Sequence, residues 1–525
     1  MSEAPPPNPH FQRLLHDSLV RAAYNWPDKE ALVTEKERVT YGRLLQLVQR
    51  CASAFTSRGL KRGDRVLIYA DNSHECVVAL WATLWAGGVF VLVNPQTKSD
   101  KLKYLLEKSE AKILVTDEHL KVEFGEILPK CTFLSGVLCS NCRVGNHVGP
   151  PNAAVENFWD VLEKETPLGS PIFNIPLDVA ALIFTSGSTG FPKGVTMTHQ
   201  AMVFARDSIT QYLRLGHDER IINILPLAFD YGLYQLLMAV GLGATLILER
   251  SFTYPGAVFA RTLKEKATVF PGVPTVYSTL LSMHKTSPIC FPSVSRVTNT
   301  AAALPPDYIP SLREIFPNAL IFAMYGLTEC KRVSYLEPEM LEAKRGSVGK
   351  AIPGTEMFLL SPEGTPVGPK EPGILHVRGP HVMAGYWNDP EATAKMIKPG
   401  KLPGERVLCA QDWFVMDEEG YFYFQGRSDD IIKTRGEKVS PVEVENVLYG
   451  LPAVKEAAVI GVPDQNLGQA IKAFVVLEKS SAVTAKEIQK HCAAHLEGFM
   501  VPQKIEFVSE LPKTTTGKIK KDALR

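Results

Sequence analysis

The stretch Thr185-Ser-Gly-Ser-Thr-Gly-Phe-Pro-Lys-Gly194 decides how the rest of the sequence is interpreted, and it directly follows the apolar run Ala181–Phe184. Glycines let the backbone turn sharply and approach a ligand closely, and successive free N–H groups in such a turn bind anions. Lys193 adds a mobile positive charge, and further donors are the hydroxyls of Thr185, Ser186, Ser188 and Thr189. Because Pro192 precedes the lysine, the pattern is not the P-loop of nucleotide hydrolases. The stretch predicts a phosphate-binding loop at the end of a buried strand.

Short apolar runs recur along the chain after this loop. They are Ile221–Leu225, Thr245–Leu248, Thr268–Phe270, Arg296–Thr298 and Leu320–Ala323. Stretches with helical periodicity lie between some of them, for example Gly256–Lys266 and Asp307–Ile315. Such alternation predicts an α/β fold, in which parallel sheets are covered by helices. Ligands of such sheets bind beyond the carboxyl ends of the strands, where the glycine-rich loop is expected.

The sequence after Gly426-Arg427 indicates a separate compact unit of about a hundred residues, within the usual size of a domain. Its expected elements are helices at Pro441–Tyr449 and Ala485–Leu496 and strands at Ala457–Val462 and Ile471–Leu477. We therefore expect an N-terminal domain over residues 1–427, a hinge over 428–430 and a C-terminal domain over 431–525.

Composition and charge exclude several classes of protein. The 525 residues carry 57 Lys plus Arg and 56 Asp plus Glu, and 45% are hydrophobic. This balance is typical of a globular protein, and a net charge of +1 gives no electrostatic reason to expect nucleic acid or an anionic membrane as a partner. The uncharged stretch Val77–Val93 is broken by Gly87-Gly88, so it predicts a buried helix, a turn and a buried strand instead of a membrane span.

Nine cysteines and a start without the charged and apolar parts of a secretory signal predict a cytoplasmic protein with free thiols. Cys139 and Cys142 form a lone CxxC pair. A structural zinc site needs four ligands, and no second pair stands close in the sequence. The pair is therefore expected to lie in an ordinary loop.

Four motifs occur in a fixed order: TSGSTGFPKGV from Thr185, Tyr325-Gly-Leu-Thr-Glu329, Gly426-Arg-Ser-Asp-Asp430 and Pro512-Lys-Thr-Thr-Thr-Gly-Lys-Ile519. Together they resemble the acyl-adenylate-forming superfamily, which holds acyl- and aryl-CoA ligases, luciferases and the adenylation domains of nonribosomal peptide synthetases. The resemblance covers the chain from about Phe11 to Arg525. It implies a large N-terminal domain of stacked mixed and parallel sheets with helices and a small barrel-like part, followed by a small mobile α+β domain.

The resemblance implies that ATP and Mg²⁺ bind at the first three motifs. An aromatic face can stack on a purine and a carboxylate is a hard ligand for Mg²⁺. Tyr325 would contact adenine beside Gly326, Thr328 would lie near the α-phosphate, and Glu329 would bind the metal. The loop would hold phosphates through Thr185, Ser186, Gly187, Ser188, Thr189, Gly190 and Lys193. An adenine wall would be formed by Ala301, Ala302 and Ala303.

Asp412 and Arg427 are the candidates for the ribose hydroxyls, since a carboxylate can accept two hydrogen bonds. The family usually has Thr-Gly-Asp where this chain has Ala410-Gln411-Asp412. The aspartate is therefore kept, and the two residues before it differ. A surface ion pair between Asp412 and Arg427 is the alternative.

The C-terminal motifs imply a domain that rotates between two reactions. Asp429 matches the hinge position. Lys518 matches the catalytic lysine, which would bridge the carboxylate and the α-phosphate and stabilise the charge that builds up as they react. In the rotated state a loop bearing Lys433, Gly436 and Lys438 would line the tunnel for the thiol arm of coenzyme A.

The acyl pocket is expected around Pro226-Leu-Ala-Phe-Asp-Tyr-Gly-Leu233. Phe229-Asp230 is similar to amino-acid-activating domains, and Tyr231-Gly-Leu is similar to aryl-CoA ligases. A carboxylate in an apolar pocket needs a partner, which is either a substrate amine or Arg332. A small flat pocket would be completed by Tyr234, Met324 and Val333.

These features predict an ATP-dependent ligase that converts a small carboxylic acid to an acyl-AMP and then to a thioester. The favoured hypothesis is that the substrate is anthranilate or a related aryl acid and that coenzyme A is the acceptor. The alternative is a small amino acid such as proline, loaded on a separate acyl carrier protein. The sequence leaves a homodimer open.

Overall fold

A computed structural model describes residues 12–143, 148–185, 192–427, 430–434, 437–464, 467–478, 481–496, 498–514 and 517–524. The chain forms two compact units. Unit 1 comprises residues 1–271, 327–332 and 379–397, and unit 2 comprises residues 272–326, 333–378 and 398–525. The chain therefore passes from unit 2 to unit 1 between Gly326 and Leu327, within the Tyr325–Glu329 motif.

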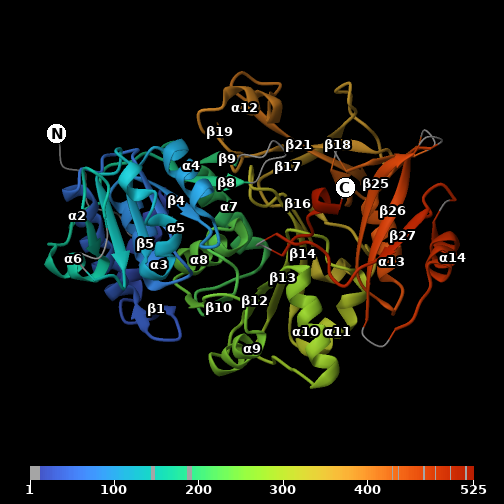
Figure 1. The fold of residues 1–525 in the computed structure, drawn as a ribbon, viewed down its shortest axis with the longest axis horizontal. Coiled ribbons are helices and arrows are strands. Elements are labelled where there is room, and N and C mark those ends of the chain that lie inside the picture. Colours follow the sequence, from blue (N-terminus) through green and yellow to red (C-terminus); the bar gives the residue numbers. More distant parts are fainter. Residues whose placement is uncertain are drawn as a thin grey trace. The chain divides into compact units, whose positions relative to one another are not determined.

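The first sheet of unit 1 has eight strands, which Figure 1 draws in blue to green except for β19, which is orange. In order across the sheet they are β19 (Gly385–Tyr386), β9 (Lys193–Thr198), β8 (Val179–Thr185), β4 (Val89–Val93), β3 (Arg65–Tyr69), β5 (Ala111–Asp117), β6 (Gly136–Ser140) and β7 (Val155–Asn157). Neighbours from β8 to β7 run parallel, and the pairs β8–β9 and β9–β19 run antiparallel. Val77–Val93 forms a helix, a turn at Gly87 (φ +73°) and a buried strand, as expected.

The strands of unit 1 in the second sheet are, in order, β12 (Val269–Gly272), β10 (Arg220–Asn223), β11 (Thr245–Leu248), β1 (Glu30–Val33) and β2 (Arg38–Thr40). The helices of unit 1 are α1 (Leu15–Asn25), α2 (Tyr41–Ser57), α3 (His74–Trp85), α4 (Ser99–Ser109), α5 (Lys121–Phe124), α6 (Phe158–Lys164), α7 (His199–Tyr212), α8 (Asp230–Leu242), α9 (Pro255–Lys264) and α12 (Pro390–Met396). Helix α3 packs on β3 and β4, while α8 packs on β10 and β11. Both helices bury nearly every residue, which is why their sequences are apolar on all sides.

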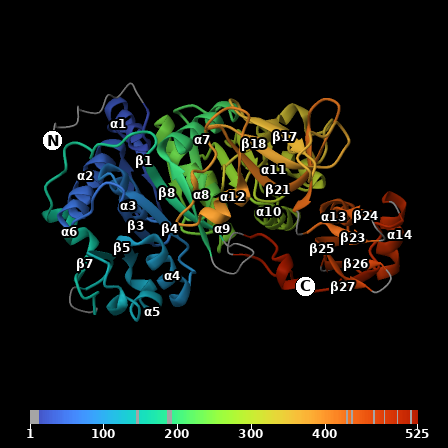
Figure 2. The same cartoon turned by 90° about the horizontal axis from the view of Figure 1, so that it is seen from above.

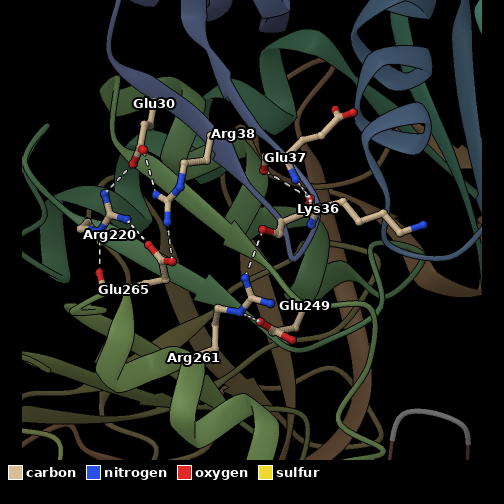
Figure 3. Close-up of polar contacts among 9 residues, drawn as sticks. Glu30, Lys36, Glu37, Arg38, Arg220, Glu249, Arg261 and Glu265 are labelled. Atoms are coloured by element: carbon tan, nitrogen blue, oxygen red, sulfur yellow. Dashed lines mark hydrogen bonds and ion pairs between the residues drawn. The ribbon is translucent and has the colours of Figure 1, made fainter.

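A ring of ion pairs holds the β1–β2 hairpin to β10 and to the residues that follow α9, and Figure 3 shows its members. Arg38 contacts Glu30 at 2.8 Å and Glu265 at 2.6 Å. Arg220 contacts the same two carboxylates at 3.1 and 2.9 Å. Because each cation meets both anions, ordering one side chain already restrains the others, which lowers the entropy cost per contact.

Unit 2 contains the strands β13 (Arg296–Asn299), β14 (Leu320–Tyr325), β15 (Ser334–Leu336) and β16 (Lys350–Ala351) and the helices α10 (Pro274–Thr286) and α11 (Ile309–Ile315). A further sheet contains β17 (Glu356–Leu360), β18 (Gly373–Arg378), β21 (Arg406–Met416) and β20 (Ile397–Pro399), with β22 (Phe422–Arg427) paired to β21. Short 3₁₀ turns of both units lie at Glu118–Leu120, Leu128–Lys130, Pro306–Tyr308, Pro338–Met340 and Lys521–Leu524.

The C-terminal part of unit 2 forms its own sheet, drawn in red in Figure 2. Its strands are β24 (Glu437–Val439), β23 (Ile432–Thr434), β26 (Gly468–Leu477) and β25 (Val454–Asp464), with β27 (Lys504–Phe507) paired to β26. The helices α13 (Pro441–Tyr449) and α14 (Ala485–His495) bury apolar residues in a common core with β25 and β26. The predicted helices and strands of this region are thus confirmed.

Two further expectations concern the whole chain. Among the described residues, no helix is long and apolar enough to cross a bilayer. All nine cysteines are free thiols. Cys139 lies in the buried strand β6, so the expectation that the CxxC pair lies in a loop is wrong for Cys139, whose carbonyl accepts from the Cys142 thiol at 3.1 Å. The expected domain boundary at 427–430 stays a prediction, because unit 2 joins residues on both sides of it.

Candidate active site

The two ends of the glycine-rich loop lie side by side on β8 and β9. Thr185 ends β8 and pairs with Lys193, which begins β9 in the antiparallel direction. Residues 186–191 lie outside the described residues, and with them Ser186, Gly187, Ser188, Thr189 and Gly190. The loop therefore connects a β-hairpin, whereas a P-loop leads from a strand into a helix.

Lys193 and Glu329, two predicted phosphate-side residues, both contact Tyr386. The Tyr386 hydroxyl donates a hydrogen bond of 2.7 Å to Glu329 Oε1. The Lys193 Nζ atom lies 5.5 Å from the centroid of the same ring, within the range of a cation–π contact. The structure thus brings the end of the loop and the Glu of the Tyr325–Glu329 motif to one aromatic side chain of unit 1.

Glu329 has the properties of a single protein ligand for Mg²⁺. It is half-buried, and in the described part of the chain no partner is found for its second oxygen, Oε2. The described residues also contain no cluster of three or more metal-ligating side chains. Mg²⁺ is usually held by one or two carboxylates together with substrate phosphates, so these residues fit a metal that arrives with ATP.

Asp230 is the first residue of α8 and is paired internally. Its Oδ1 atom lies 3.3 Å from the Lys331 ammonium, and the two residues are 8% and 1% exposed. Burial lowers the pKa of Lys331, while the adjacent Asp230 carboxylate acts to raise it. The sequence left a substrate amine and Arg332 as alternative partners of Asp230, and the partner within the protein is neither of these but Lys331.

Arg332 lies on the face of Tyr231, with its guanidinium carbon 4.7 Å from the ring centroid. Its Nη1 donates to the Lys331 carbonyl at 3.4 Å, and its buried Nε finds no partner among the described residues. The Tyr234 hydroxyl is likewise buried without a partner in the described chain, and burial raises its pKa well above the usual range. Phe229 stands edge-on to Tyr231 at 6.4 Å. This part of unit 1 combines aromatic faces with two unused hydrogen-bond donors.

Local sequence explains why these side chains are held firmly. Gly232 lies so close to the Pro226 carbonyl that an added Cβ would stand 2.3 Å from its oxygen. Lys331 has a left-handed backbone (φ +68°), which is uncommon outside glycine and occurs often at functional sites. Both Cys330 and Lys331 donate their N–H groups to the Leu327 carbonyl. The first turn of α8 and the 327–332 turn are therefore fixed by backbone contacts.

The predicted ribose and adenine residues meet in unit 2. The Tyr325 hydroxyl donates to Asp412 Oδ2, and Arg427 Nε lies 3.7 Å from Asp412 Oδ1. Asp412 and Arg427 are register partners on β21 and β22. The Tyr325 ring stacks on Phe424, with 6.0 Å between centroids. The departure at Gln411, noted in the sequence, coincides with a left-handed residue (φ +58°) directly before the acid.

Ala301, Ala302 and Ala303 form a turn after β13, and Ala301 has a left-handed backbone (φ +76°). Asn299 holds this turn by donating to the Ala302 carbonyl at 2.9 Å. A small pocket of unit 2 is lined by Asn299, Ala303, Leu304, Pro306, Ile309, Ala323, Met324, Leu336, Leu341, Gly346, Ser347 and Val348. Met324 and Val333 belong to unit 2 and Tyr234 to unit 1.

Lys518 is exposed on a hairpin turn, where its N–H donates to Thr514 Oγ1 at 3.0 Å and its carbonyl accepts from the Thr514 N–H at 2.7 Å. The preceding Gly517 has φ +81°, and a Cβ there would lie 2.6 Å from Thr275 Oγ1 within the same unit. Asp429 and Gly436 lie outside the described residues, and Lys433 and Lys438 are described by their backbone in β23 and β24.

Three residues were missed by the sequence analysis. Lys331 neutralises Asp230, Tyr386 joins Lys193 to Glu329, and Asn299 supports the alanine turn. The only signals were a basic residue beside Arg332, an aromatic residue after Gly385, and a polar residue closing a strand. Such signals are too common to select one residue without a fold.

Family models match most of the chain. The model described as AMP-binding enzyme covers residues 19–387, and the model described as AMP-binding enzyme C-terminal domain covers residues 443–518. The long-chain-fatty-acid–CoA ligase of Bacillus subtilis (strain 168) is 31% identical over 541 residues, covering 98% of this chain and 94% of that protein. A feruloyl-CoA synthase of Amycolatopsis sp. is 32% identical over 510 residues, covering 96% and 97%.

Solved structures show the same fold. The structure of the anthranilate CoA ligase AuaEII in complex with anthranoyl-AMP has a TM-score of 0.90 at 26% identity, covering 98% of this chain and 96% of that chain. A benzoate CoA ligase from Burkholderia xenovorans LB400 has a TM-score of 0.87 at 27% identity, covering 98% and 99%. The expected mixed α/β architecture, with a large N-terminal and a small C-terminal domain, is confirmed. The chain belongs to the AMP-binding enzyme family, within the acyl-adenylate-forming superfamily, and is an AMP-forming acid–thiol ligase.

Proposed function

We propose that the chain activates a small aryl acid, anthranilate or a close relative, and transfers it to coenzyme A. The carboxylate attacks the α-phosphorus of ATP, which gives the acyl-AMP and releases pyrophosphate. The thiol of coenzyme A then attacks the acyl carbon, and AMP leaves. Supporting this choice, structural neighbours include an anthranilate and a benzoate CoA ligase, and Phe229, Tyr231 and Tyr234 supply aromatic walls.

The Asp230–Lys331 pair is the observation that carries the choice of substrate. The amino group of anthranilate is uncharged at neutral pH, so it can donate to the Asp230 oxygen that Lys331 does not contact. The ammonium of an amino acid would instead bring a second cation beside the buried Lys331, which the low-dielectric surroundings disfavour. The pair therefore favours an aryl amine over an α-amino acid.

Each group of residues has one task in the adenylation step. The loop from Thr185 to Gly190 and Lys193 hold the triphosphate, and Thr328 lies by the α-phosphate. Tyr325 and the turn Ala301–Ala303 hold adenine, with Gly326 beside it, while Asp412 and Arg427 hold the ribose. Mg²⁺ bound at Glu329 would neutralise phosphate charge and help pyrophosphate leave.

Lys518 bridges the attacking carboxylate and the α-phosphate and stabilises their combined charge. The thioester step uses the other face of the C-terminal domain after rotation at residues 428–430, with Asp429 as the hinge. Lys433, Gly436 and Lys438 then line the thiol tunnel. Nine free thiols support a reducing compartment, and we place the enzyme in the cytoplasm.

A panel of acids tests the substrate. Pyrophosphate release is measured with anthranilate, other aminobenzoates, benzoate, proline and further amino acids, first without acceptor and then with coenzyme A or carrier proteins. We expect anthranilate to give the highest kcat/KM and coenzyme A to be acylated. Release with amino acids alone would reject the proposal.

The second candidate is an amino-acid adenylating ligase that loads a separate carrier protein. The Phe229-Asp230 dipeptide favours it, since amino-acid-activating domains carry that pattern. In the panel above it predicts proline-dependent release and no acylation of coenzyme A.

The role of Lys518 is tested separately. The variant Lys518→Ala is expected to lower acid-dependent pyrophosphate exchange by about 100-fold or more, as removal of a charge-stabilising group does. Thioester formation from synthetic acyl-AMP is the matched control and should be retained. Exchange near the wild-type rate would show that Lys518 has been assigned the wrong role.

A further inference from the structure

We propose that Tyr386 is a positioning residue, which orients the side chains of Glu329 and Lys193 to bind a divalent cation and the triphosphate that carries it. The inference rests on the proposed function, because it gives Tyr386 a role in nucleotide binding at the same site. Its hydroxyl donates to Glu329 Oε1 at 2.7 Å, and its ring lies 5.5 Å from the Lys193 ammonium. One side chain thus contacts the expected metal ligand and the expected phosphate ligand.

The backbone around Tyr386 is fixed from both sides. It pairs with Val195 on β9, and the next residue, Trp387, donates its N–H to the Gly194 carbonyl at 2.7 Å. The Tyr386 N–H donates to Thr393 Oγ1 at 2.9 Å. Gly385 has φ +142°, and an added Cβ would lie 2.8 Å from the Thr393 methyl. The ring therefore projects from a strand edge that is attached to the end of the phosphate loop.

The same segment also holds the backbone of Glu329. The N–H of Met383 donates to the Glu329 carbonyl at 2.8 Å. Glu329 is therefore fixed at its main chain by Met383 and at its carboxylate by Tyr386. Residues 383–387 connect the exit strand of the loop to the Tyr325–Glu329 motif within unit 1.

The chemistry of the contacts explains why a tyrosine suits this place. A hydroxyl donor orients the carboxylate without forming an ion pair with it, so Oε2 stays available to a cation. An arginine or lysine there would neutralise Glu329 and weaken metal binding. In the same way, a ring face under Lys193 restrains the ammonium without an anion, and none of the described carboxylates forms an ion pair with Lys193. Both charges stay available for ligands.

Two substitutions separate the two contacts. Tyr386→Phe removes the hydroxyl and keeps the ring, while Tyr386→Leu removes both. Tyr423→Phe is the matched control, because its hydroxyl also donates to a carboxylate, that of Asp417 at 3.3 Å, on β22. Urea unfolding of each variant reports whether the fold is kept.

The main readout is metal binding without turnover. Mn²⁺ is titrated into the protein with ATP and no acid, and bound Mn²⁺ is followed by electron paramagnetic resonance. Loss of a residue that orients a metal ligand typically costs 10- to 100-fold in affinity. We expect Tyr386→Phe to weaken Mn²⁺ binding about tenfold, and Tyr423→Phe to leave it unchanged.

The second readout separates the metal from the phosphate contact. With saturating Mg²⁺, the KM for ATP in pyrophosphate exchange should stay near wild type in Tyr386→Phe and rise about threefold in Tyr386→Leu, the loss of one cation–π contact. An unchanged Mn²⁺ titration in a folded Tyr386→Phe variant would overturn the inference. Failure of the wild type to activate any aryl acid would reject the proposed substrate and leave this binding result unaffected.

Discussion

Two carboxylates of unit 1, Glu329 and Asp230, have different partners in the protein. Glu329 is half-buried and accepts one hydrogen bond from an uncharged phenol, that of Tyr386. Asp230 is 8% exposed and contacts a buried ammonium, that of Lys331. Glu329 forms no ion pair with the described residues and is left for a cation from outside, whereas Asp230 is paired with a cation of the protein.

This difference in partners determines which kind of ligand each carboxylate can bind. A carboxylate without an ion pair attracts a metal ion with little regard to the rest of the ligand. A carboxylate that is already paired contributes mainly hydrogen-bonding capacity, which depends on the shape and the donors of the ligand. We therefore expect changes at Glu329 to affect every acid alike, and changes at Asp230 to depend on the acid.

The largest expected effect concerns the paired carboxylate. Asp230→Ala leaves the Lys331 ammonium buried alone, which costs about 3–5 kcal/mol when one partner of a buried pair is removed. Urea unfolding measures it. Glu391→Ala, in an exposed pair with Lys395, is the control and should leave the stability unchanged. The double variant Asp230→Asn/Lys331→Met should recover most of the loss, and equal instability of the single and double variants would contradict the pairing.

The carboxylate without an ion pair predicts a large kinetic effect without acid dependence. Glu329→Gln keeps the shape and removes the charge that binds the metal. Pyrophosphate exchange should fall about 100-fold with anthranilate and with benzoate alike. A loss confined to one acid would break the comparison between the two carboxylates.

Acid conditions would obscure both measurements, because two buried histidines destabilise the fold there. His16 on α1 and His199 on α7 lie edge-on at 5.8 Å, and the Leu15 N–H donates to His199 Nδ1. Burial lowers the pKa of His16 to about 4 and that of His199 to about 3. The unfolded chain takes up protons below about pH 6.5 while the folded chain does not, so stability falls as the pH drops from 6.5 toward 4.

At pH 5 each histidine should account for roughly 2 kcal/mol of lost stability relative to pH 7.5. His199→Gln should shrink the difference between urea unfolding at the two pH values by about that amount. His217→Gln, at a side chain that is 53% exposed, should leave the difference unchanged. The same pH dependence in His199→Gln as in wild type would contradict the assignment.

The smallest expected effect is on discrimination between acids. Asp230→Leu/Lys331→Met, which removes the acceptor together with the buried ammonium, should lower the ratio of kcat/KM for anthranilate over benzoate about five- to tenfold, the worth of one hydrogen bond in a buried site. Equal losses for the two acids would remove Asp230 as the contact of the amino group.

Local patterns were enough for much of the fold. Ala181–Phe184 lies in β8 and Leu320–Ala323 lies in β14, because short apolar runs bounded by turn residues form buried strands. The direction of β9 was not predictable in this way. The strand β9 returns antiparallel to β8, which precedes it, and its other edge pairs with β19, which comes from a segment far along the chain.

For the site, too, sequence motifs predicted some contacts and missed those between distant residues. The motifs located Tyr325, Asp412 and Arg427, which do meet in unit 2. The partner of Asp230 stands 101 residues away, and the partner of Glu329 stands 57 residues away. Neither Lys331 nor Tyr386 belongs to a motif quoted from the sequence. A buried carboxylate at Asp230 needs a partner, but only the folded chain shows which cation is that partner.

The Asp230–Lys331 contact has a consequence for redesign. Since each residue compensates the other, altering one alone leaves an isolated ion in the interior, and most single substitutions there would be lost to misfolding before any new substrate is tried. Libraries that randomise positions 230 and 331 jointly avoid this barrier. They would also show whether natural diversification at this place has to proceed through coordinated double changes.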